Sequence, residues 1–263
     1  ILIDIGVNLT NARFDKGRAA VIERAKLVNI QGMLVTGTNV AESEKALSLC
    51  YEFPQYLACT AGVHPHDADN VADNYLAQLS TLAKHEHVKA IGECGLDFNR
   101  NFSSPQNQKK VFAQQVALAG EIKLPLFLHQ RDAFEAWLDI LKPFIDDVPA
   151  MVTHCFTGDL SQLKQCLDYD MYIGITGWIC DERRGYELQE IAKYIPLERL
   201  LIETDAPYLT PRNIRPKPKS SRNEPSYLPY IVETLANVTS YSASEIMQKT
   251  FENTQRVFSW DAR

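Results

Sequence analysis

The sequence predicts an α/β protein, specifically a single (β/α)8 barrel of the TIM type that spans residues 1–263. Three observations indicate this fold. Short apolar runs alternate with stretches of helical periodicity eight times along the chain. Several of these runs end on His, Glu or Asp, as expected where an active site lies at the carboxyl ends of barrel strands. The length of 263 residues fits one barrel of the usual ~250 residues, and no flexible linker or internal repeat divides it.

The predicted strands are short and mostly apolar. They are expected at residues 1–8, 30–36, 57–63, 89–92, 124–128, 149–153, 171–176 and 199–203. Helices are predicted at residues 18–28, 41–51, 75–83, 105–122, 133–141, 160–167, 186–194, 227–237 and 243–258. Ser104 before Pro105 is typical of a helix start, and Ser242 with Glu245 forms a capping-box pattern.

Composition and charge restrict the kind of protein. Hydrophobic residues make up 45% of the chain and charged residues 23%, which is typical of a soluble globular protein. The sequence shows no signal peptide and no run of membrane-spanning length, so we expect a cytoplasmic protein without membrane contacts. We also expect the protein to be a monomer. A net charge of −6 argues against indiscriminate nucleic-acid binding by the whole surface.

The cysteines form no C-x-x-C pair and no disulfide framework, so we expect reduced thiols in the core. Two of them, Cys94 and Cys155, directly follow Glu93 and His154. Because successive side chains of a strand face opposite sides, both thiols are expected to pack away from these neighbours.

Four strand-end residues predict a metal site. Glu93, His129 and His154 end the fourth, fifth and sixth strands, and Asp205 follows the eighth. Imidazole and carboxylate ligands that converge from rigid strands form a recurrent hydrolytic set, with positions left open for water. Glu203, two residues before Asp205, faces the same way, and two carboxylates there are costly unless a cation lies near them.

His64 and His66 are separated by one residue and share a strand face if the strand persists through Pro65. They are candidates for metal ligands, phosphate donors or a proton relay. His85 and His87 also have metal-like spacing, but they precede the fourth strand and so belong to the opposite end of the barrel.

Basic residues near the strand ends predict phosphate contacts. Arg131 follows His129 by two positions, and Arg183 and Arg184 follow the seventh strand, although surface salt bridges are an equally good explanation of the latter pair. The segment between Asp205 and Glu224 has no acidic residue but carries Arg212, Arg215, Lys217, Lys219 and Arg222. Tyr208 and Phe98 are candidates for stacking on a base.

Five segments give the chain a resemblance to the TatD family of metal-dependent deoxyribonucleases. They are GVHPH at 62–66, AIGECGLD at 90–97, LHQR at 128–131, HCFTG at 154–158 and LIETDAPY at 201–208. The resemblance implies an amidohydrolase-like barrel and a 3′–5′ exonuclease acting on single-stranded DNA and RNA. It also implies that Glu93, His129 and His154 bind the divalent cation, that Asp205 completes the site, and that His64 contacts the scissile phosphate.

The chain departs from the family at its first strand. Most members open with Asp-x-His-x-His, whose histidines bind a second metal, but these positions hold Gly6 and Asn8 here. Glycine cannot ligate a metal and asparagine does so weakly. We therefore expect one tight metal, held by Glu93, His129 and His154.

The expected reaction is cleavage of a phosphodiester. In this hypothesis the cation polarises a phosphoryl oxygen and activates a water whose proton Asp205 accepts, with Glu203 beside it, while His64, His66, Arg131, Arg183 and Arg222 contact phosphates. Phosphoryl transfer and the resemblance favour Mg2+, whereas two imidazoles favour Zn2+ or Mn2+. A role in DNA repair or nucleic-acid turnover follows from this activity.

Two other classes of function remain as alternatives. A barrel with these ligands could hydrolyse a small amide, lactone or phosphoester, although the basic segment after Asp205 argues against it. A non-catalytic role in a repair or quality-control complex is the second alternative, and the intact set of strand-end ligands argues against that one.

Overall fold

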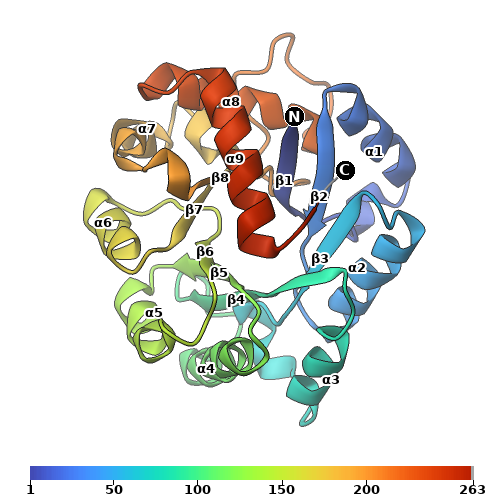
Figure 1. Cartoon of the computed structure of the whole chain (residues 1–263), viewed down its shortest axis with the longest axis vertical. Coiled ribbons are helices and arrows are strands. Elements are labelled where there is room, and N and C mark those ends of the chain that lie inside the picture. Colours follow the sequence, from blue (N-terminus) through green and yellow to red (C-terminus); the bar gives the residue numbers. More distant parts are fainter. Residues whose placement is uncertain (262–263) are drawn as a thin grey trace. The chain divides into compact units, whose positions relative to one another are not determined.

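The computed structural model describes residues 1–261. It contains an eight-stranded sheet in the order β1 to β8, with helices between consecutive strands (Figure 1). The strands are β1 (Leu2–Val7), β2 (Ile30–Val35), β3 (Leu57–Ala61), β4 (Val88–Asp97), β5 (Leu126–Arg131), β6 (Met151–Thr153), β7 (Tyr172–Ile175) and β8 (Leu200–Ile202). The predicted α/β barrel fold is confirmed, and no helix among residues 1–261 is long and apolar enough to cross a membrane.

The helices follow the predicted segments closely. They are α1 (Arg18–Leu27), α2 (Val40–Glu52), α3 (Tyr75–Leu82), α4 (Pro105–Ile122), α5 (Phe134–Leu141), α6 (Leu160–Asp168), α7 (Tyr186–Ile191), α8 (Leu228–Val238) and α9 (Ala243–Phe258). Both predicted starts are confirmed: Ser104 caps α4, and Ser242 forms a capping box with Glu245 in α9. The predicted helix over 186–194 ends sooner, since its last three residues form a separate 3-10 turn.

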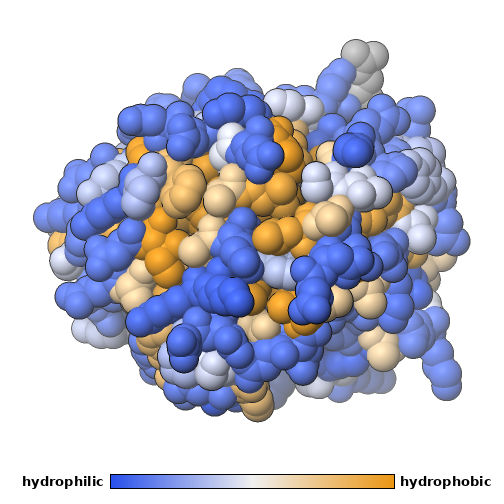
Figure 2. All heavy atoms as spheres, turned by 90° about the horizontal axis from the view of Figure 1, so that it is seen from below, coloured by the Kyte–Doolittle hydropathy of each residue, from blue (hydrophilic) through white to orange (hydrophobic). Residues whose placement is uncertain are grey.

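The chain divides into two compact units. One comprises Ile1–Val35 and the described part of His154–Arg263, and the other comprises Thr36–Thr153. Each unit has its own buried apolar residues, and on the face drawn in Figure 2 hydrophobic residues lie among hydrophilic ones. That the whole chain behaves as one domain stays a prediction.

In the first unit, β1 joins the segment that follows β8. The amide of Asp205 donates to the carbonyl oxygen of Gly6 at 2.8 Å, and the amide of Asn8 donates to that of Ala206 at 2.8 Å. Helix α9, drawn in red in Figure 1, packs on both β1 and β8. The backbone therefore fixes Asp205 beside the end of β1.

In the second unit, β4 is longer than predicted. Glu93 and His129 were expected to end their strands, but β4 runs on to Asp97 and β5 to Arg131. The reason is a β-bulge: Gly92 pairs with Phe127 and Cys94 with Leu128, which leaves Glu93 as the extra residue. A bulge re-aims the side chain of the extra residue without ending the strand.

Two glycines permit the close pairing of β4 with β5 on either side of this bulge. Gly92 has φ of +148° and Gly95 has φ of +154°, a region that residues with a Cβ rarely adopt. A Cβ on Gly95 would lie 1.7 Å from the carbonyl oxygen of His129. Glycine at position 95 is therefore required by the backbone of β5 itself.

The strand expected at residues 57–63 ends at Ala61, so His64 and His66 do not share a strand face. Pro65 starts a short 3-10 helix, Pro65–Asn70, because proline lacks the amide that a further strand residue would use for pairing. His64 caps that turn, and its ring still lies against that of His66, with centroids 4.4 Å apart.

Replacement of Gly95 with alanine should destabilise the protein by at least ~2 kcal/mol, since both φ and a backbone clash oppose the new Cβ. Gly17→Ala is the matched control, because Gly17 has φ of +100° but nothing within 4 Å of its would-be Cβ. Urea unfolding measures both. Equal losses in the two variants would contradict the proposed clash with His129.

Candidate metal centre

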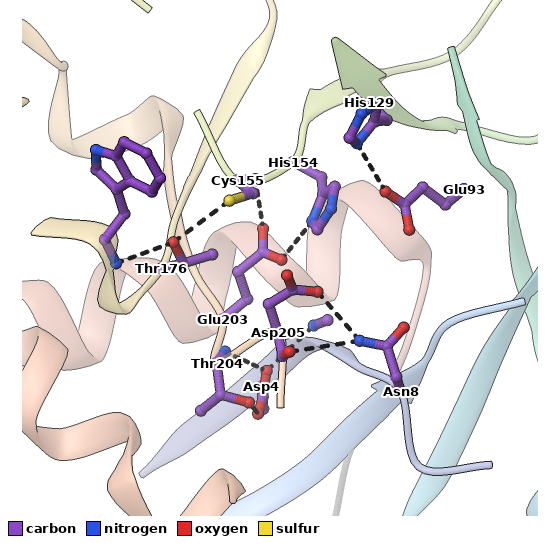
Figure 3. Close-up of polar contacts among 12 residues, drawn as sticks. Asp4, Asn8, Glu93, His129, His154, Cys155, Thr176, Glu203, Thr204 and Asp205 are labelled. Carbon is purple, nitrogen blue, oxygen red and sulfur yellow. Dashed lines mark hydrogen bonds and ion pairs between the residues drawn. The ribbon is translucent and has the colours of Figure 1, made fainter. Parts of the chain in front are cut away.

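A buried carboxylate pair surrounds His129 in the second unit. The Nδ1 atom of His129 lies 3.1 Å from Oε2 of Glu93, and its Nε2 atom lies 3.0 Å from Oδ2 of Asp97. Glu93 is 5% exposed and Asp97 is 4% exposed. Figure 3 shows the His129 ring pointing at the Glu93 carboxylate. Two buried negative charges thus share one imidazole.

The hydrogen bonds define the charge on His129. An ionised carboxylate only accepts hydrogen bonds, so both ring nitrogens must donate for both contacts to form. Burial alone raises the pKa of Asp97, but the hydrogen bond and positive charge of His129 hold that pKa well below its usual range. The imidazolium supplies the positive charge that a cation would otherwise supply between these carboxylates.

Asp97 was not among the predicted site residues. It is four positions after Glu93, so the two side chains share a strand face whenever the strand continues that far. The prediction ended the strand at Glu93 and so missed it. The signal that could have revealed Asp97 was Gly95, because a glycine within an apolar run indicates close approach of another strand rather than a strand end.

His64 lies beside Glu93, and its tautomer follows from its contacts. Its Nδ1 atom accepts the amide proton of His66 at 3.0 Å, which places the single proton of the neutral ring on Nε2, 3.6 Å from Oε2 of Glu93. Burial lowers the pKa of His64 to about 3 and keeps the ring neutral. His64 is therefore arranged as a hydrogen-bond donor at Nε2, which favours the phosphate-donor role over the ligand role.

His66 lies beside Asp97. Its Nε2 atom is 3.4 Å from Oδ2 of Asp97, and its ring packs edge-on against Phe102 with centroids 4.7 Å apart. The contact places His66 at the outer side of the same cluster, where its side chain is about one-third exposed.

In the first unit, His154 is oriented by Glu203. The two residues meet at 2.5 Å between Nδ1 and Oε1, and the other oxygen of Glu203 accepts the amide of Cys155 at 3.1 Å (Figure 3). Glu203 is fully buried. Because Nδ1 of His154 donates to a carboxylate, its Nε2 carries the lone pair that a metal would use, the usual arrangement of a ligand histidine. Glu203 is thus a positioning residue for His154.

The reason given for the expected placement of Cys155, strand alternation, is wrong. Cys155 lies after β6 with φ of +48°, so strand alternation does not apply to it. Its thiol lies 3.4 Å from Oγ1 of Thr176, and burial raises the thiol's pKa to about 12. Cys94 is fully buried, and burial raises its pKa too, so both thiols stay protonated. Cys94 packs in the core as expected, whereas Cys155 is only partly buried.

Asp205 is held by Asn8, the residue that stands where most of the family has a histidine. The Asn8 side-chain amide donates to Oδ1 of Asp205 at 3.1 Å and to the carbonyl oxygen of Ala206 at 3.2 Å. Since a carbonyl oxygen only accepts, these contacts fix the nitrogen of Asn8 toward Asp205. Asn8 therefore presents N–H groups at this point rather than a metal-binding atom.

Asp4 fastens the segment that carries Glu203 and Asp205. Its carboxylate accepts the amide of Thr204 at 3.0 Å, the hydroxyl of Thr204 at 2.5 Å and the amide of Gly6 at 3.1 Å. Asp4 is fully buried and has no basic partner among residues 1–261, and burial raises its pKa to about 7 despite these hydrogen bonds. Thr204 lies between the two site carboxylates, so Asp4 fixes the orientation of both.

The predicted phosphate-contacting arginines have different surroundings. Arg131 is exposed at the end of β5. Arg183 forms a two-pronged pair with Asp181, at 3.0 and 2.9 Å. Arg222 donates to the carbonyl oxygen of Arg13 and lies over the ring of Phe14. In the basic segment, Arg212 pairs with Glu182, whereas Lys217 and Lys219 are exposed.

Within residues 1–261, two groups of side chains have the atoms to hold a cation. Potential ligand atoms of His64, Glu93 and His129 lie within 4.8 Å of one another, as do those of His154, Glu203 and Asp205. Nitrogen and carboxylate oxygen donors of this kind suit Mg2+, Mn2+ or Zn2+. The donor sets therefore fit a divalent metal, and His85 and His87 belong to neither group.

Comparison with known proteins identifies the class and then the family. A parallel α/β barrel with imidazole and carboxylate groups on its strand ends defines a metal-dependent hydrolase. The family model described as TatD related DNase matches residues 3–259, and the chain belongs to this TatD family.

Relatives and solved structures agree with this assignment. The chain is 51% identical over 257 residues, 98% of this chain and 99% of the relative, to a protein of Pectobacterium atrosepticum named 3′-5′ ssDNA/RNA exonuclease TatD. The structure of YJJV, a TatD homolog from Escherichia coli K12, matches with a TM-score of 0.89 and 26% identity, covering 99% of this chain and 98% of that one. A TatD family hydrolase from Entamoeba histolytica matches with a TM-score of 0.89 and 27% identity over 98% and 97%.

Replacement of Glu203 with glutamine should weaken metal binding about 10–100-fold, because a neutral amide orients the His154 ring less strongly. Calorimetric titration of the metal-stripped protein with Mn2+ measures the change. Glu187→Gln, the same substitution on an exposed side chain, is the control. Unchanged affinity in Glu203→Gln would show that Glu203 does not act through His154.

Asp4 predicts a pH dependence of stability. The pKa of Asp4 is raised from 3.8 to about 7 in the folded protein, so ionisation of this carboxyl favours the unfolded state. The protonated carboxyl contributes its full stability below the unfolded pKa, and this contribution is lost as the pH rises through the folded pKa. Between about pH 4 and about pH 7, the unfolding free energy of the wild type should fall relative to Asp4→Asn. Urea unfolding across this range measures it. A difference that is constant with pH would contradict the shift.

Proposed function

We propose that this protein is a metal-dependent 3′–5′ exonuclease that hydrolyses single-stranded DNA and RNA. The observation that carries the proposal is its identity of about half, over nearly the whole chain, with relatives named for that activity. The imidazole and carboxylate groups in both units supply the chemistry that phosphodiester hydrolysis needs.

The metal ligands in this proposal are Glu93, His129, His154 and Asp205. Their support is chemical. The Nδ1 atom of His154 is held by Glu203, which leaves its Nε2 atom free to bind a metal. His129 lies against two buried carboxylates, and a divalent cation bound there would displace a proton from its ring and take over the positive charge that the proton supplied. Mg2+ is the working ion in our proposal, with Mn2+ and Zn2+ as substitutes for the same donors. Asn8 presents N–H groups to Asp205, which disfavours a second tightly held cation at that point.

A divalent cation held by these residues would supply Lewis acidity, which favours attack of water on a phosphodiester. Asp205 accepts the proton of the attacking water in this proposal, with one of its oxygens already steadied by Asn8. Glu203 acts through His154 by holding its ring orientation. His64 donates from Nε2 to a phosphate oxygen, which offsets negative charge as it develops.

Phosphate binding is the proposed task of the basic side chains. Arg131 is exposed and ready for such a contact, and His66 is partly exposed beside Asp97. Arg183 has a carboxylate partner, Asp181, but its side chain is 61% exposed, so it can still offer donors to a phosphate. Arg222, held by a carbonyl oxygen and an aromatic ring, is preorganised for the same role.

We further propose that the enzyme acts in the cytoplasm as a monomer, in DNA repair or nucleic-acid turnover. The cysteine spacing supports a reducing compartment, because it forms no disulfide framework. The one-domain organisation of residues 1–263 belongs to the same proposal and is supported by a family match from residue 3 to residue 259.

The direct test uses metal-stripped protein with Mg2+, Mn2+ or Zn2+ added separately. One sample of single-stranded DNA is labelled at its 5′ end and another at its 3′ end. The proposal predicts a descending ladder from the 5′ label and early release of the labelled nucleotide from the 3′ end. Absence of cleavage with every ion would contradict it and would direct attention to small esters, amides and lactones.

Asp205→Asn should lower kcat about 100-fold or more while changing KM little, because the amide cannot accept the proton of water. Asp170→Asn is a matched control, since Asp170 has the same φ of 58° but lies on the surface beside Arg199. Steady-state hydrolysis of single-stranded DNA measures both variants. Near-normal turnover by Asp205→Asn would remove the proposed general base.

A further inference from the structure

Trp178 and Arg184 form a preformed stack in the first unit, the unit that also holds His154, Glu203 and Asp205. The Arg184 guanidinium lies over the Trp178 ring, 4.0 Å from its centroid. Its Nε atom also donates to Oδ2 of the buried Asp181 at 3.1 Å. The aromatic ring and the carboxylate together fix a guanidinium plane whose side chain remains 49% exposed.

The loop that carries this stack is tightly held. The amide of Gly185 donates to the carbonyl oxygen of Asp181 at 2.7 Å, and the amide of Asp181 donates to that of Trp178 at 3.1 Å. A Cβ on Gly177 would lie 2.2 Å from the carbonyl oxygen of Leu209, so the loop also packs closely against the basic segment. The stack is therefore presented by a rigid support.

A short series of contacts links the stack to His154. The amide of Trp178 donates to Oγ1 of Thr176 at 3.3 Å, and Oγ1 of Thr176 lies 3.4 Å from the thiol of Cys155. Cys155 follows His154 and donates its amide to Glu203. Figure 3 shows this series from Thr176 through Cys155 to Glu203. The loop begins directly after β7, at the same end of its strand as the site residues that follow β6 and β8.

We infer that Trp178 and Arg184 form a nucleobase-binding subsite, in which a base of the single-stranded substrate stacks on the exposed face of the Arg184 guanidinium. The inference rests on the proposed function and adds a binding contact to the base to the proposed contacts with phosphate. Stacking on a planar cation or an aromatic ring tolerates every base, so such a subsite would not restrict the sequence of the strand. The preformed plane also lowers the entropy that binding must overcome.

The chain contains a natural control for this stack. Arg199 lies over the ring of Tyr172 at 4.8 Å, with Arg199 just before β8 and Tyr172 at the start of β7. This second pair has the same chemistry but sits at the amino ends of the strands, away from the site. A purely structural role for Arg-aromatic stacks would make the two pairs equivalent.

The test measures the Kd of a fluorescein-labelled oligothymidylate in EDTA, where no turnover occurs. Arg184→Lys keeps the charge but loses the plane, and Trp178→Leu removes the support. Each should raise Kd about tenfold. Arg199→Lys should leave Kd unchanged, and Trp178→Phe should largely preserve it. Equal Kd values for Arg184→Lys and the wild type would overturn the subsite.

An abasic site placed at each position of the oligonucleotide in turn locates the base. At one position, the abasic substitution and Arg184→Lys should each cost about tenfold, and together they should cost no more than either alone. Additive losses at every position would overturn the subsite. Fluorescence gives an independent reading, because Trp137 and Trp260 are buried, so oligonucleotide should quench the wild type and not Trp178→Phe.

Wild-type cleavage of the same oligonucleotide with Mn2+, run in parallel, separates the two proposals. Cleavage by the wild type together with normal binding by Arg184→Lys would overturn the subsite alone. Neither binding nor cleavage by the wild type would overturn the proposed exonuclease and the subsite with it.

Discussion

The cost of burying carboxylates shapes the candidate ligand groups in both units. Glu93, Asp97 and Glu203 are each almost inaccessible to water, and an unpaired buried charge costs several kcal/mol or more. The protein offsets this cost with histidine. His129 lies between Glu93 and Asp97, and His154 meets Glu203. These histidine contacts allow the folded protein to keep the carboxylates buried where a cation could bind them.

Backbone geometry delivers these groups. The bulge at Glu93 and the glycines around it let β4 pair closely with β5 while one strand presents both Glu93 and Asp97 to the same histidine. In the other unit, Asp4 and Asn8 extend from the first strand to the segment after β8. Asp4 fixes Thr204, and Asn8 holds the carboxylate of Asp205. The first strand thus supports the site without supplying a metal-binding histidine.

Much of this could be predicted from sequence, for identifiable reasons. Strand and helix positions follow from hydrophobic periodicity, and the two capped helix starts depend on local residues only. The choice of Glu93, His129 and His154 follows from their place in apolar runs. What could not be predicted depends on contacts between distant residues. The bulge that brings Asp97 into the site, the turn at Pro65, and the Glu203 contact with His154 are set by tertiary pairing.

The hydrogen bonds also assign different roles to residues of the same type, which residue type alone cannot do. His64 and His154 are both imidazoles, but the first accepts a backbone amide at Nδ1 and the second donates there to a carboxylate. One ring is therefore arranged as a donor at Nε2 and the other as a ligand. Glu203 and Asp205 are likewise separated, since one holds His154 and the other is held by Asn8.

The most direct test of the central claim is the stability of metal-stripped protein with and without Mn2+, measured for the wild type and for Glu93→Gln. If buried carboxylates await a cation, saturating Mn2+ should raise the unfolding free energy of the wild type by at least ~2 kcal/mol, and Glu93→Gln should gain far less. Without metal, the variant should be no more stable than the wild type, because it removes a buried charge but also one carboxylate partner of His129. An equal gain in both proteins, or none in the wild type, would contradict the claim.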